Sequence, residues 1–163
     1  MNIAAKLKKA LVKSDIDVGF VEPTDWLSTG IYSLNFDMTG DFKRGVTNKR
    51  SVLFWGPSGV GKSFIVSNIA KSAQDSGYTV IYIDTERAAH TEYMERIGID
   101  TKNEESFQII NIATIEEATT VMSNLFSIMD SESKVCVVLD SLSNLLSSKE
   151  VNDFDKSDSK GDQ

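Results

Sequence analysis

The sequence predicts an α/β protein with three layers, in which helices cover both faces of a mostly parallel sheet. Three observations predict this class. Short apolar runs alternate with amphipathic helical stripes between Ser51 and Asp140. A glycine-rich loop follows the first apolar run and precedes the first stripe. The segments between successive runs are long enough for crossover helices, which make neighbouring strands parallel.

The composition restricts the kind of protein further. The chain has 163 residues, of which 40% are apolar and 25% charged, and this size suits one domain. Its net charge of −7 provides no fold-wide basic surface for nucleic acid, so any DNA contact would be local. One cysteine and one histidine argue against a disulfide framework, a cysteine-rich zinc site or histidine-based metal chemistry. With neither a membrane-spanning run nor a secretory signal in view, we expect a cytoplasmic protein that uses nucleotides.

The first segment, residues 1–13, predicts a short amphipathic helix with four lysines and no acid. Its apolar face consists of Ile3, Leu7, Ala10 and Leu11. Such a face needs a covering surface, which is either a partner or the chain's own domain. Residues 14–50 predict irregular to weakly β structure punctuated by glycines.

The alternating pattern begins after this segment. The strands are expected at 51–55, 78–84, 107–112 and 135–140. The helices are expected around 65–73, 91–97 and 114–129. Thr114 and Glu117 have the spacing of a capping box at the start of the last helix.

The domain organisation follows from these elements. We expect an N-terminal helix and linker at 1–20 and a nucleotide-binding core at 21–146. Residues 147–163 are dominated by serine and acidic residues, so they predict a polar, mobile tail.

The glycine-rich loop fits the pattern G-x-x-x-x-G-K-[ST] at every fixed position. Glycines let backbone N–H groups turn toward phosphate oxygens, and a helix N-terminus adds partial positive charge. Lys62 would reach the β- and γ-phosphates, and the Ser63 hydroxyl would bind Mg²⁺. The alternative is a structural glycine turn. The expected nucleotide-binding residues are Gly56, Pro57, Ser58, Gly59, Val60, Gly61, Lys62, Ser63 and Phe64.

Acidic residues end two of the expected strands. The carboxyl ends of parallel strands meet at one edge of the sheet, so Asp140 should lie near Ser63 and hold Mg²⁺ or its bound water. Asp84 and Glu86 close the second strand, and either could align the water that attacks the γ-phosphate. For Glu86, whose position just past the strand favours this role, a solvated or salt-bridged carboxylate remains the alternative.

Three further residues have weaker signals. Tyr93 is expected on the inner face of its helix, where it either packs or stacks on adenine. His90 is expected at the surface. Cys136 is expected to be a small buried hydrophobic residue.

An ordered series of short segments adds a resemblance to a known family. The segments are LSTG at 27–30 with Ser33-Leu34, GPSGVGKS at 56–63, YIDTE at 82–86, EYMERIGID at 92–100 and VVLDSLSNLLSSKE at 137–150. In this order they resemble the N-terminal half of a RecA-type recombinase core, nearest to the tailed-phage UvsX branch.

The resemblance implies a RecA-like P-loop NTPase fold with ATP and Mg²⁺ as cofactors. It implies that Glu86 is the catalytic carboxylate, acting with Lys62, and that Tyr93 lies near the adenine. It further implies that the N-terminal helix packs on a neighbouring protomer in a filament, and that single-stranded DNA is a partner in the full-length context.

The sequence also departs from the family pattern. His90 stands where bacterial RecA proteins commonly have an acidic residue. The family core continues with two DNA-binding loops, a sensor glutamine and further strands, which nothing here matches. One of those strands lies between the phosphate-loop strand and the Asp140 strand, so we expect a sheet that is incomplete on its C-terminal side, with two unpaired edges.

The leading interpretation is the ATP-binding part of a DNA strand-exchange recombinase that hydrolyses ATP with Mg²⁺ and serves recombination and repair. One alternative is another RecA-fold ATPase, such as a replicative helicase domain or a KaiC-like protein. Another is a non-catalytic module that binds a full-length recombinase.

Overall fold

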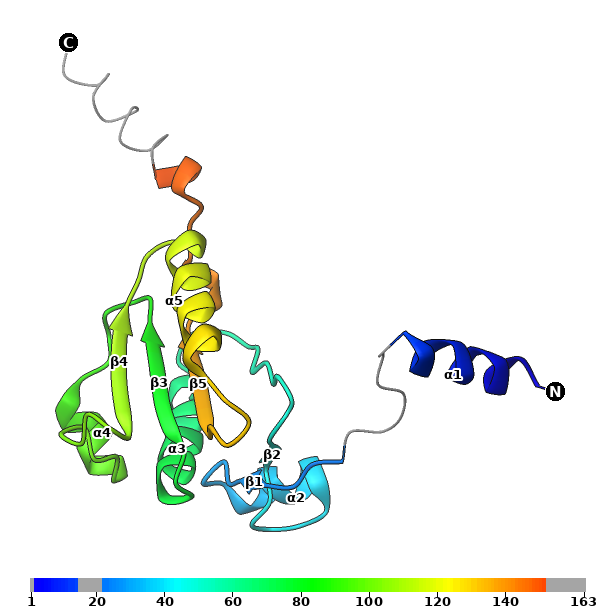
Figure 1. Ribbon diagram of the computed structural model, residues 1–163. Coiled ribbons are helices and arrows are strands. Elements are labelled where there is room, and N and C mark those ends of the chain that lie inside the picture. The colour runs from blue at the N-terminus through cyan, green and yellow to red at the C-terminus, as the bar shows by residue number, and fades with distance from the viewer. Residues whose placement is uncertain (1, 15–21, 152–163) are drawn as a thin grey trace.

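A computed structural model describes residues 2–14 and 22–151 of the chain (Figure 1). Its helices are α1 (Ile3–Lys13), α2 (Tyr32–Thr39), α3 (Lys62–Asp75), α4 (Thr91–Ile97), α5 (Ile115–Ile128) and a 3₁₀ turn, η1 (Leu142–Asn144). Its strands are β1 (Trp26–Leu27), β2 (Val46–Thr47), β3 (Thr79–Asp84), β4 (Phe107–Asn111) and β5 (Val135–Asp140).

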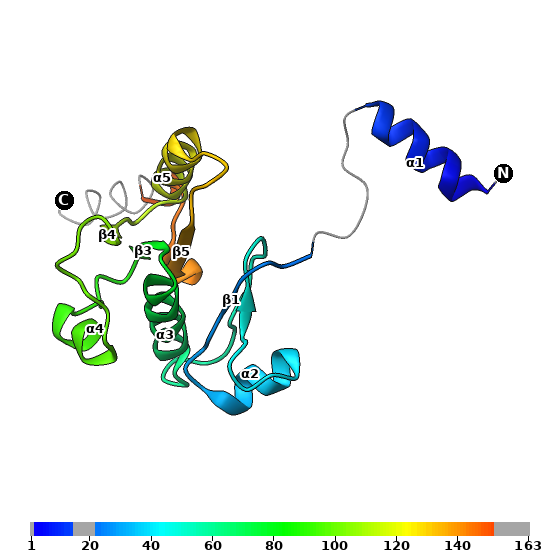
Figure 2. The ribbon, with the colours of Figure 1, turned by 60° about the horizontal axis from the view of Figure 1, so that its bottom comes forward.

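The main sheet confirms the predicted α/β class. It has the strand order β4-β3-β5, and both pairings are parallel. Figures 1 and 2 show α3 and α5 on opposite faces of this sheet, with α4 beside α3. The three layers therefore correspond to those that the sequence predicts.

The core lies between β3 and α3. The central strand contributes Val80 and Tyr82, each at most 2% exposed, and α3 contributes Ala70 and Ala73, which are fully buried. Small residues on α3 let the helix approach the strand closely, which fixes the position of its N-terminus beside the ends of β3 and β5. This packing positions the candidate site.

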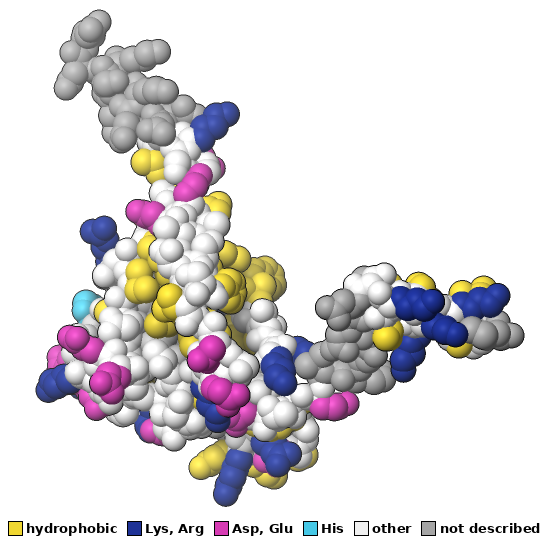
Figure 3. Space-filling view, viewed as in Figure 1, with side chains coloured by type: hydrophobic (Ala, Val, Ile, Leu, Met, Phe, Trp, Pro, Cys, Tyr) yellow, Lys and Arg dark blue, Asp and Glu magenta, His cyan; other side chains and the backbone are white. Residues whose placement is uncertain are grey.

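Helix α5 begins with the predicted capping box, in which Thr114 accepts from the Glu117 N–H and the Glu117 side chain accepts from the Thr114 N–H. No residue of α5 is buried. The predicted apolar stripe is half-buried, and Figure 3 shows apolar side chains around this helix. Phe126 and Ile128 are 64% and 80% exposed, so much of the apolar surface of α5 is uncovered.

The predicted strand at 51–55 is wrong. These residues belong to no strand and, within the described residues, make no backbone hydrogen bond. The physical reason is that a strand needs a partner, and no described strand lies beside this segment. Among the described strands, β5 pairs only with β3 and forms the edge of the sheet.

Residues 22–50 are more regular than the sequence predicts. They contain the antiparallel pair β1–β2 and the helix α2, which ends at Gly40 with φ 75°. The unit is attached to the core by Asp25, which accepts from the Tyr78 hydroxyl at 2.8 Å and pairs with Lys134 at 3.3 Å. Burial and the Asp25 carboxylate raise the pKa of Tyr78 to about 12, so this hydroxyl remains a donor at neutral pH.

The predicted N-terminal helix is confirmed as α1, with Asn2 as its N-cap. None of its residues is buried, and Figures 1 and 2 show it apart from the other helices. The predicted linker and most of the predicted polar tail, residues 152–163, lie outside the described residues. Residues 148–151 form a helical turn, with Ser147 and Glu150 bonded to each other. Among the described helices, none has the length and apolar character to cross a bilayer.

Candidate functional site

The loop before α3 presents backbone N–H groups without acceptors. Gly59 and Gly61 have φ values of 80° and 92°, a region that glycine adopts without steric cost. The first amide in this stretch to donate is that of Ile65, to Gly61 O at 3.0 Å. The amides of residues 58–64 have no acceptor among the described residues. A row of free amides at a helix N-terminus is suited to binding an anion such as phosphate.

Lys62 begins α3 and folds back over the loop. Its Nζ donates to Gly56 O at 2.9 Å and to Pro57 O at 2.8 Å. The ammonium group therefore lies above the same loop whose amides are free. This adds a full positive charge to the partial charge of the helix N-terminus.

A pocket of about 60 Å³ collects the other predicted site residues at the carboxyl edge of the sheet. Ser63, Glu86, Tyr93 and Asp140 all line it. The register that pairs Asp84 with Asp140 brings the ends of β3 and β5 to the same level. Residues separated by up to 77 positions are thus brought together beside the N-terminus of α3.

The pocket offers oxygen donors of the kind that Mg²⁺ prefers. These are the Ser63 hydroxyl and the Asp140 carboxylate. The described part of the chain has no group of three or more His, Cys, Asp or Glu residues that could hold a metal ion. A Mg²⁺ site with two protein oxygens, completed by phosphate and water, fits the ordinary coordination of this ion.

A contact that the sequence did not predict holds the Asp140 carboxylate. The Tyr82 hydroxyl donates to Asp140 Oδ2 at 3.0 Å, while Oδ1 has no hydrogen-bond partner among the described residues. Burial, reinforced by the Asp140 charge, raises the pKa of Tyr82 well above its usual value, so it stays protonated and donates. One carboxylate oxygen is fixed and the other remains open to a ligand.

The two acids that close β3 have different roles in the structure. Asp84 is 3% exposed, and its oxygens accept the N–H groups of Glu86 at 2.9 Å and Ala89 at 2.8 Å. Asp84 therefore shapes the turn after the strand. Glu86 is exposed, and its Oε1 accepts from the Ser141 hydroxyl at 3.1 Å. Glu86 is the carboxylate that remains accessible to a bound molecule.

Ser141 connects the ends of the two strands. Its N–H donates to Thr85 Oγ1 at 2.9 Å, and its carbonyl accepts from the same hydroxyl at 2.8 Å. The Asp140–Ser141 peptide bond is cis. The hydrogen bonds of Ser141 to Thr85 and Glu86 connect the end of β3 to the end of β5.

The remaining candidates occupy the rim of the site or lie apart from it. Tyr93 on α4 is 39% exposed, more than its predicted place on the inner face of the helix implies, and it lines the small pocket together with the neighbouring Met94, which is 2% exposed. Phe64 is 46% exposed on the first turn of α3 and is not among the lining residues of that pocket. His90 is exposed, as predicted. Cys136 is half-buried, and burial raises the pKa of its thiol to about 11, which agrees with its predicted role as an unreactive hydrophobic residue.

Comparison with known proteins identifies relatives of this chain. The model of the RecA N-terminal domain matches residues 7–163. Protein RecA of Clostridium botulinum is 37% identical over 79 residues, which cover 48% of this chain and 21% of that relative. Protein RecA of Streptomyces venezuelae is 32% identical over 83 residues, which cover 50% of this chain and 21% of that relative.

A longer match extends to Protein RecA of Saccharopolyspora erythraea. It is 30% identical over 130 residues, or 79% of this chain and 35% of that relative. The matched segments thus span only about a fifth to a third of the length of these three relatives.

Proposed function

Since the chain belongs to the RecA N-terminal domain family, we propose that it is the ATP-binding part of a DNA strand-exchange recombinase that hydrolyses ATP with Mg²⁺. One observation supports this most strongly. A loop with free amides and a lysine adjoins a pocket lined by Ser63, Glu86 and Asp140. This arrangement combines a phosphate-binding loop, oxygens suited to a metal ion and an accessible carboxylate.

In this proposal the loop and Lys62 bind the phosphates. The amides of residues 58–64 donate to phosphate oxygens, and the Lys62 ammonium exchanges its contacts with Gly56 and Pro57 for the β- and γ-phosphates. Ser63 and Asp140 hold Mg²⁺, directly or through water, and Tyr82 orients Asp140. The bound ion supplies charge neutralisation on the phosphates.

Glu86 is the proposed general base. Its carboxylate is accessible and is held by the Ser141 hydroxyl, so it can accept a proton from a water aligned with the γ-phosphate. Tyr93, exposed at the rim of the pocket, is the proposed contact for the adenine ring.

DNA and filament contacts belong to the full-length protein in this proposal. Self-association is assigned to α1, whose exposed Ile3 and Leu7 form an apolar face opposite a lysine-rich one. Single-stranded DNA would be bound by regions outside the matched segment. The family match favours a recombinase over a replicative helicase or KaiC-like ATPase, and the relation to the UvsX branch stays a prediction.

The role of Asp140 predicts a loss of magnesium dependence in Asp140→Asn. The full chain should bind ATP about tenfold or more tightly with Mg²⁺ than with a chelator, since a contact to a charged group contributes ~1.5–3 kcal/mol. In Asp140→Asn this difference should fall below about threefold. Calorimetric titration with ATP provides the measurement.

Asp130→Asn is the matched control, because Asp130 is an exposed acid whose hydrogen bonds are confined to its own turn. It should retain the magnesium dependence. If Mg²⁺ raises the ATP affinity of Asp140→Asn as much as that of the wild type, the proposed role of Asp140 at the metal site is wrong.

In this proposal, strand exchange requires the parts of the RecA relatives that lie outside the segments matched by this chain. We therefore expect a chimera, in which this chain replaces the corresponding segment of Clostridium botulinum RecA, to pair and exchange DNA strands. In the chimera Glu86→Gln should slow ATP hydrolysis about 10²–10⁴-fold, the usual contribution of a general base, while ATP affinity stays within about threefold. Unwinding of duplex DNA without pairing would instead support the helicase reading.

A further inference from the structure

The Asp140 carboxylate is held by one side chain of the neighbouring strand. The Tyr82 hydroxyl donates to Oδ2 at 3.0 Å, and Oδ1 accepts no hydrogen bond from the described residues. The carboxylate therefore has one oxygen that is already occupied and one that is open. Any cation in the small pocket that Asp140 lines would meet a single open oxygen on this residue.

The position of Tyr82 in the sheet explains this contact. In the parallel ladder Tyr82 pairs with Val138, so Asp140 lies two residues beyond the partner of Tyr82. Side chains two residues apart on a strand share a face, and here it is the face on which α3 packs. An aromatic side chain is long enough to reach such a diagonal neighbour. The tyrosine hydroxyl therefore meets the carboxylate from the side of the core.

The packing around Tyr82 keeps its hydroxyl in this place. The side chain is 2% exposed and belongs to the same buried cluster as Ala70 and Ala73 of α3. A ring in a close-packed cluster has little room to turn away, and turning would take a buried hydroxyl from its charged acceptor, which is unfavourable. Oδ2 of Asp140 therefore stays occupied when a ligand enters the pocket.

Divalent cations differ in how they use a carboxylate. Mg²⁺ is small, keeps several of its waters and is satisfied by one oxygen of a carboxylate. Ca²⁺ takes about six to eight oxygens and frequently binds both oxygens of one carboxylate. The open oxygen of Asp140 and the Ser63 hydroxyl thus meet the needs of Mg²⁺ more fully than those of Ca²⁺.

The two other carboxylates that line the pocket do not replace the missing oxygen. Both oxygens of Asp84 accept N–H groups of the turn, from Glu86 and Ala89. Oε1 of Glu86 accepts from the Ser141 hydroxyl, and the proposed function assigns this carboxylate to the attacking water. What the site offers a cation therefore depends on how many oxygens Asp140 has open.

We propose that Tyr82 is a specificity-determining residue of the cation site, which favours Mg²⁺ over Ca²⁺ because the occupied Oδ2 restricts Asp140 to one oxygen. Tyr82 acts through Asp140, so it is a positioning residue and not a ligand. The restriction is the same whether Oδ1 reaches the ion directly or through a bound water. The inference rests on the proposed function, in which Asp140 holds the ion that accompanies ATP.

The first measurement uses the unaltered 163-residue chain. Calorimetric titration with ATP, in saturating Mg²⁺ and in saturating Ca²⁺, gives two dissociation constants whose ratio is the selectivity of the site. We expect ATP to bind about tenfold or more tightly with Mg²⁺ than with Ca²⁺. Equal affinity with the two ions would overturn the proposal, because there would be no preference for Tyr82 to impose.

The substitution Tyr82→Phe removes the hydroxyl and keeps the ring. With Oδ2 released, binding with Ca²⁺ should strengthen relative to binding with Mg²⁺, so the ratio should fall about fivefold or more. A loss of stability does not imitate this result, since an unfolded fraction weakens binding with both ions by the same factor. When Asp140→Asn is already present, Tyr82→Phe should change the ratio by less than about twofold, because the two residues act as a pair.

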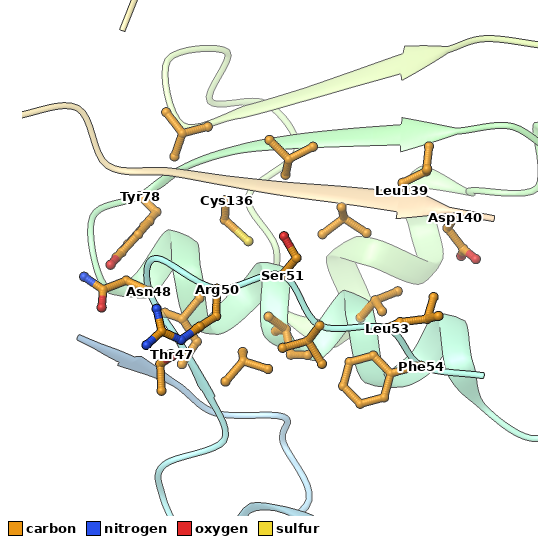
Figure 4. Close-up of a pocket in the computed structure, with 18 of the residues that line it drawn as sticks. Thr47, Asn48, Arg50, Ser51, Leu53, Phe54, Tyr78, Cys136, Leu139 and Asp140 are labelled. Carbon is orange, nitrogen blue, oxygen red and sulfur yellow. The ribbon is translucent and has the colours of Figure 1, made fainter. Parts of the chain in front are cut away.

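Tyr78→Phe is the matched control for the loss of a buried hydroxyl. Tyr78 is 7% exposed, and its hydroxyl donates to the Asp25 carboxylate at 2.8 Å. Figure 4 shows Tyr78 near the opposite end of β5 from Asp140, and Tyr78 is not among the residues that line the small pocket. Tyr78→Phe should keep the wild-type ratio within about twofold.

The outcomes separate this inference from the proposed function. If the wild type binds ATP with neither ion, or if Asp140→Asn keeps the wild-type response to Mg²⁺, the proposed function fails and the inference fails with it. If the response to Mg²⁺ depends on Asp140 but Tyr82→Phe keeps the wild-type ratio, only the role of Tyr82 is wrong. That role is also wrong if Tyr78→Phe lowers the ratio as much as Tyr82→Phe does.

Discussion

Replacing Lys62 with alanine is expected to weaken ATP binding by at least about 30-fold, since a hydrogen-bonded contact between charged groups contributes ~2 kcal/mol. Lys62 is the first residue of α3, and its ammonium group contacts the loop whose amides are free. Its present partners are two backbone carbonyls, Gly56 O and Pro57 O, which can turn to solvent when the side chain is removed. The loss should therefore appear in binding and not in folding.

Lys71→Ala is the matched control for this experiment. Lys71 is also on α3 and pairs with Asp75 at the other end of the helix. Fluorescent ATP analogue titration of the full chain should show unchanged affinity in Lys71→Ala and a large loss in Lys62→Ala, with similar thermal midpoints in both. If wild type and Lys62→Ala bind ATP equally weakly, the loop is a structural turn and the interpretation as a non-catalytic module gains.

The second large effect is expected at Asn35, a buried polar residue of α2. It is fully buried, and its side chain makes four hydrogen bonds. Oδ1 accepts from the N–H and hydroxyl of Thr29, and Nδ2 donates to Ser28 Oγ and Phe42 O. A Cβ on Gly45 would come within 2.6 Å of Asn35 Oδ1, so the backbone is packed directly against this amide.

Asn35→Ala should lower the free energy of unfolding by about 3 kcal/mol, because each buried group left without a partner costs ~1–3 kcal/mol. Urea unfolding followed by tryptophan fluorescence would measure the loss, since Trp26 on β1 lies in the same unit. Asn124→Ala is the control: the Asn124 side chain is exposed on α5 and makes no hydrogen bond to any residue that the structure describes. A loss below about 1 kcal/mol for Asn35→Ala would show that the network is not a main support of residues 22–50.

The elements that the sequence predicted well are those with a local signal. Helix α5 has an apolar stripe and a capping box, and β3 and β5 are short apolar runs that end in acids. The glycine-rich loop before α3 was located from its motif, and its binding of nucleotide stays a prediction. That Ser63 and Asp140 would face the same pocket followed from the rule for parallel strands.

The elements that the sequence missed depend on distant partners. Residues 51–55 have a strand-like pattern, but a strand forms only beside another one. Helix α2 shows no amphipathic pattern, because it exposes Tyr32 and Phe36 while it buries the polar Asn35. In the site, the hydrogen bond from Tyr82 to Asp140 joins residues 58 positions apart, so no local sequence motif contains both of them.

The isolated position of α1 has an electrostatic consequence. Its four lysines carry all the formal charge of residues 1–14, which leaves 13 basic and 24 acidic residues in the rest of the chain. The basic helix and the remainder of the chain therefore carry formal charges of opposite sign, so that they attract each other electrostatically. Because exposed charges more than ~10 Å apart are screened at 0.1 M salt, this attraction should weaken as ionic strength rises.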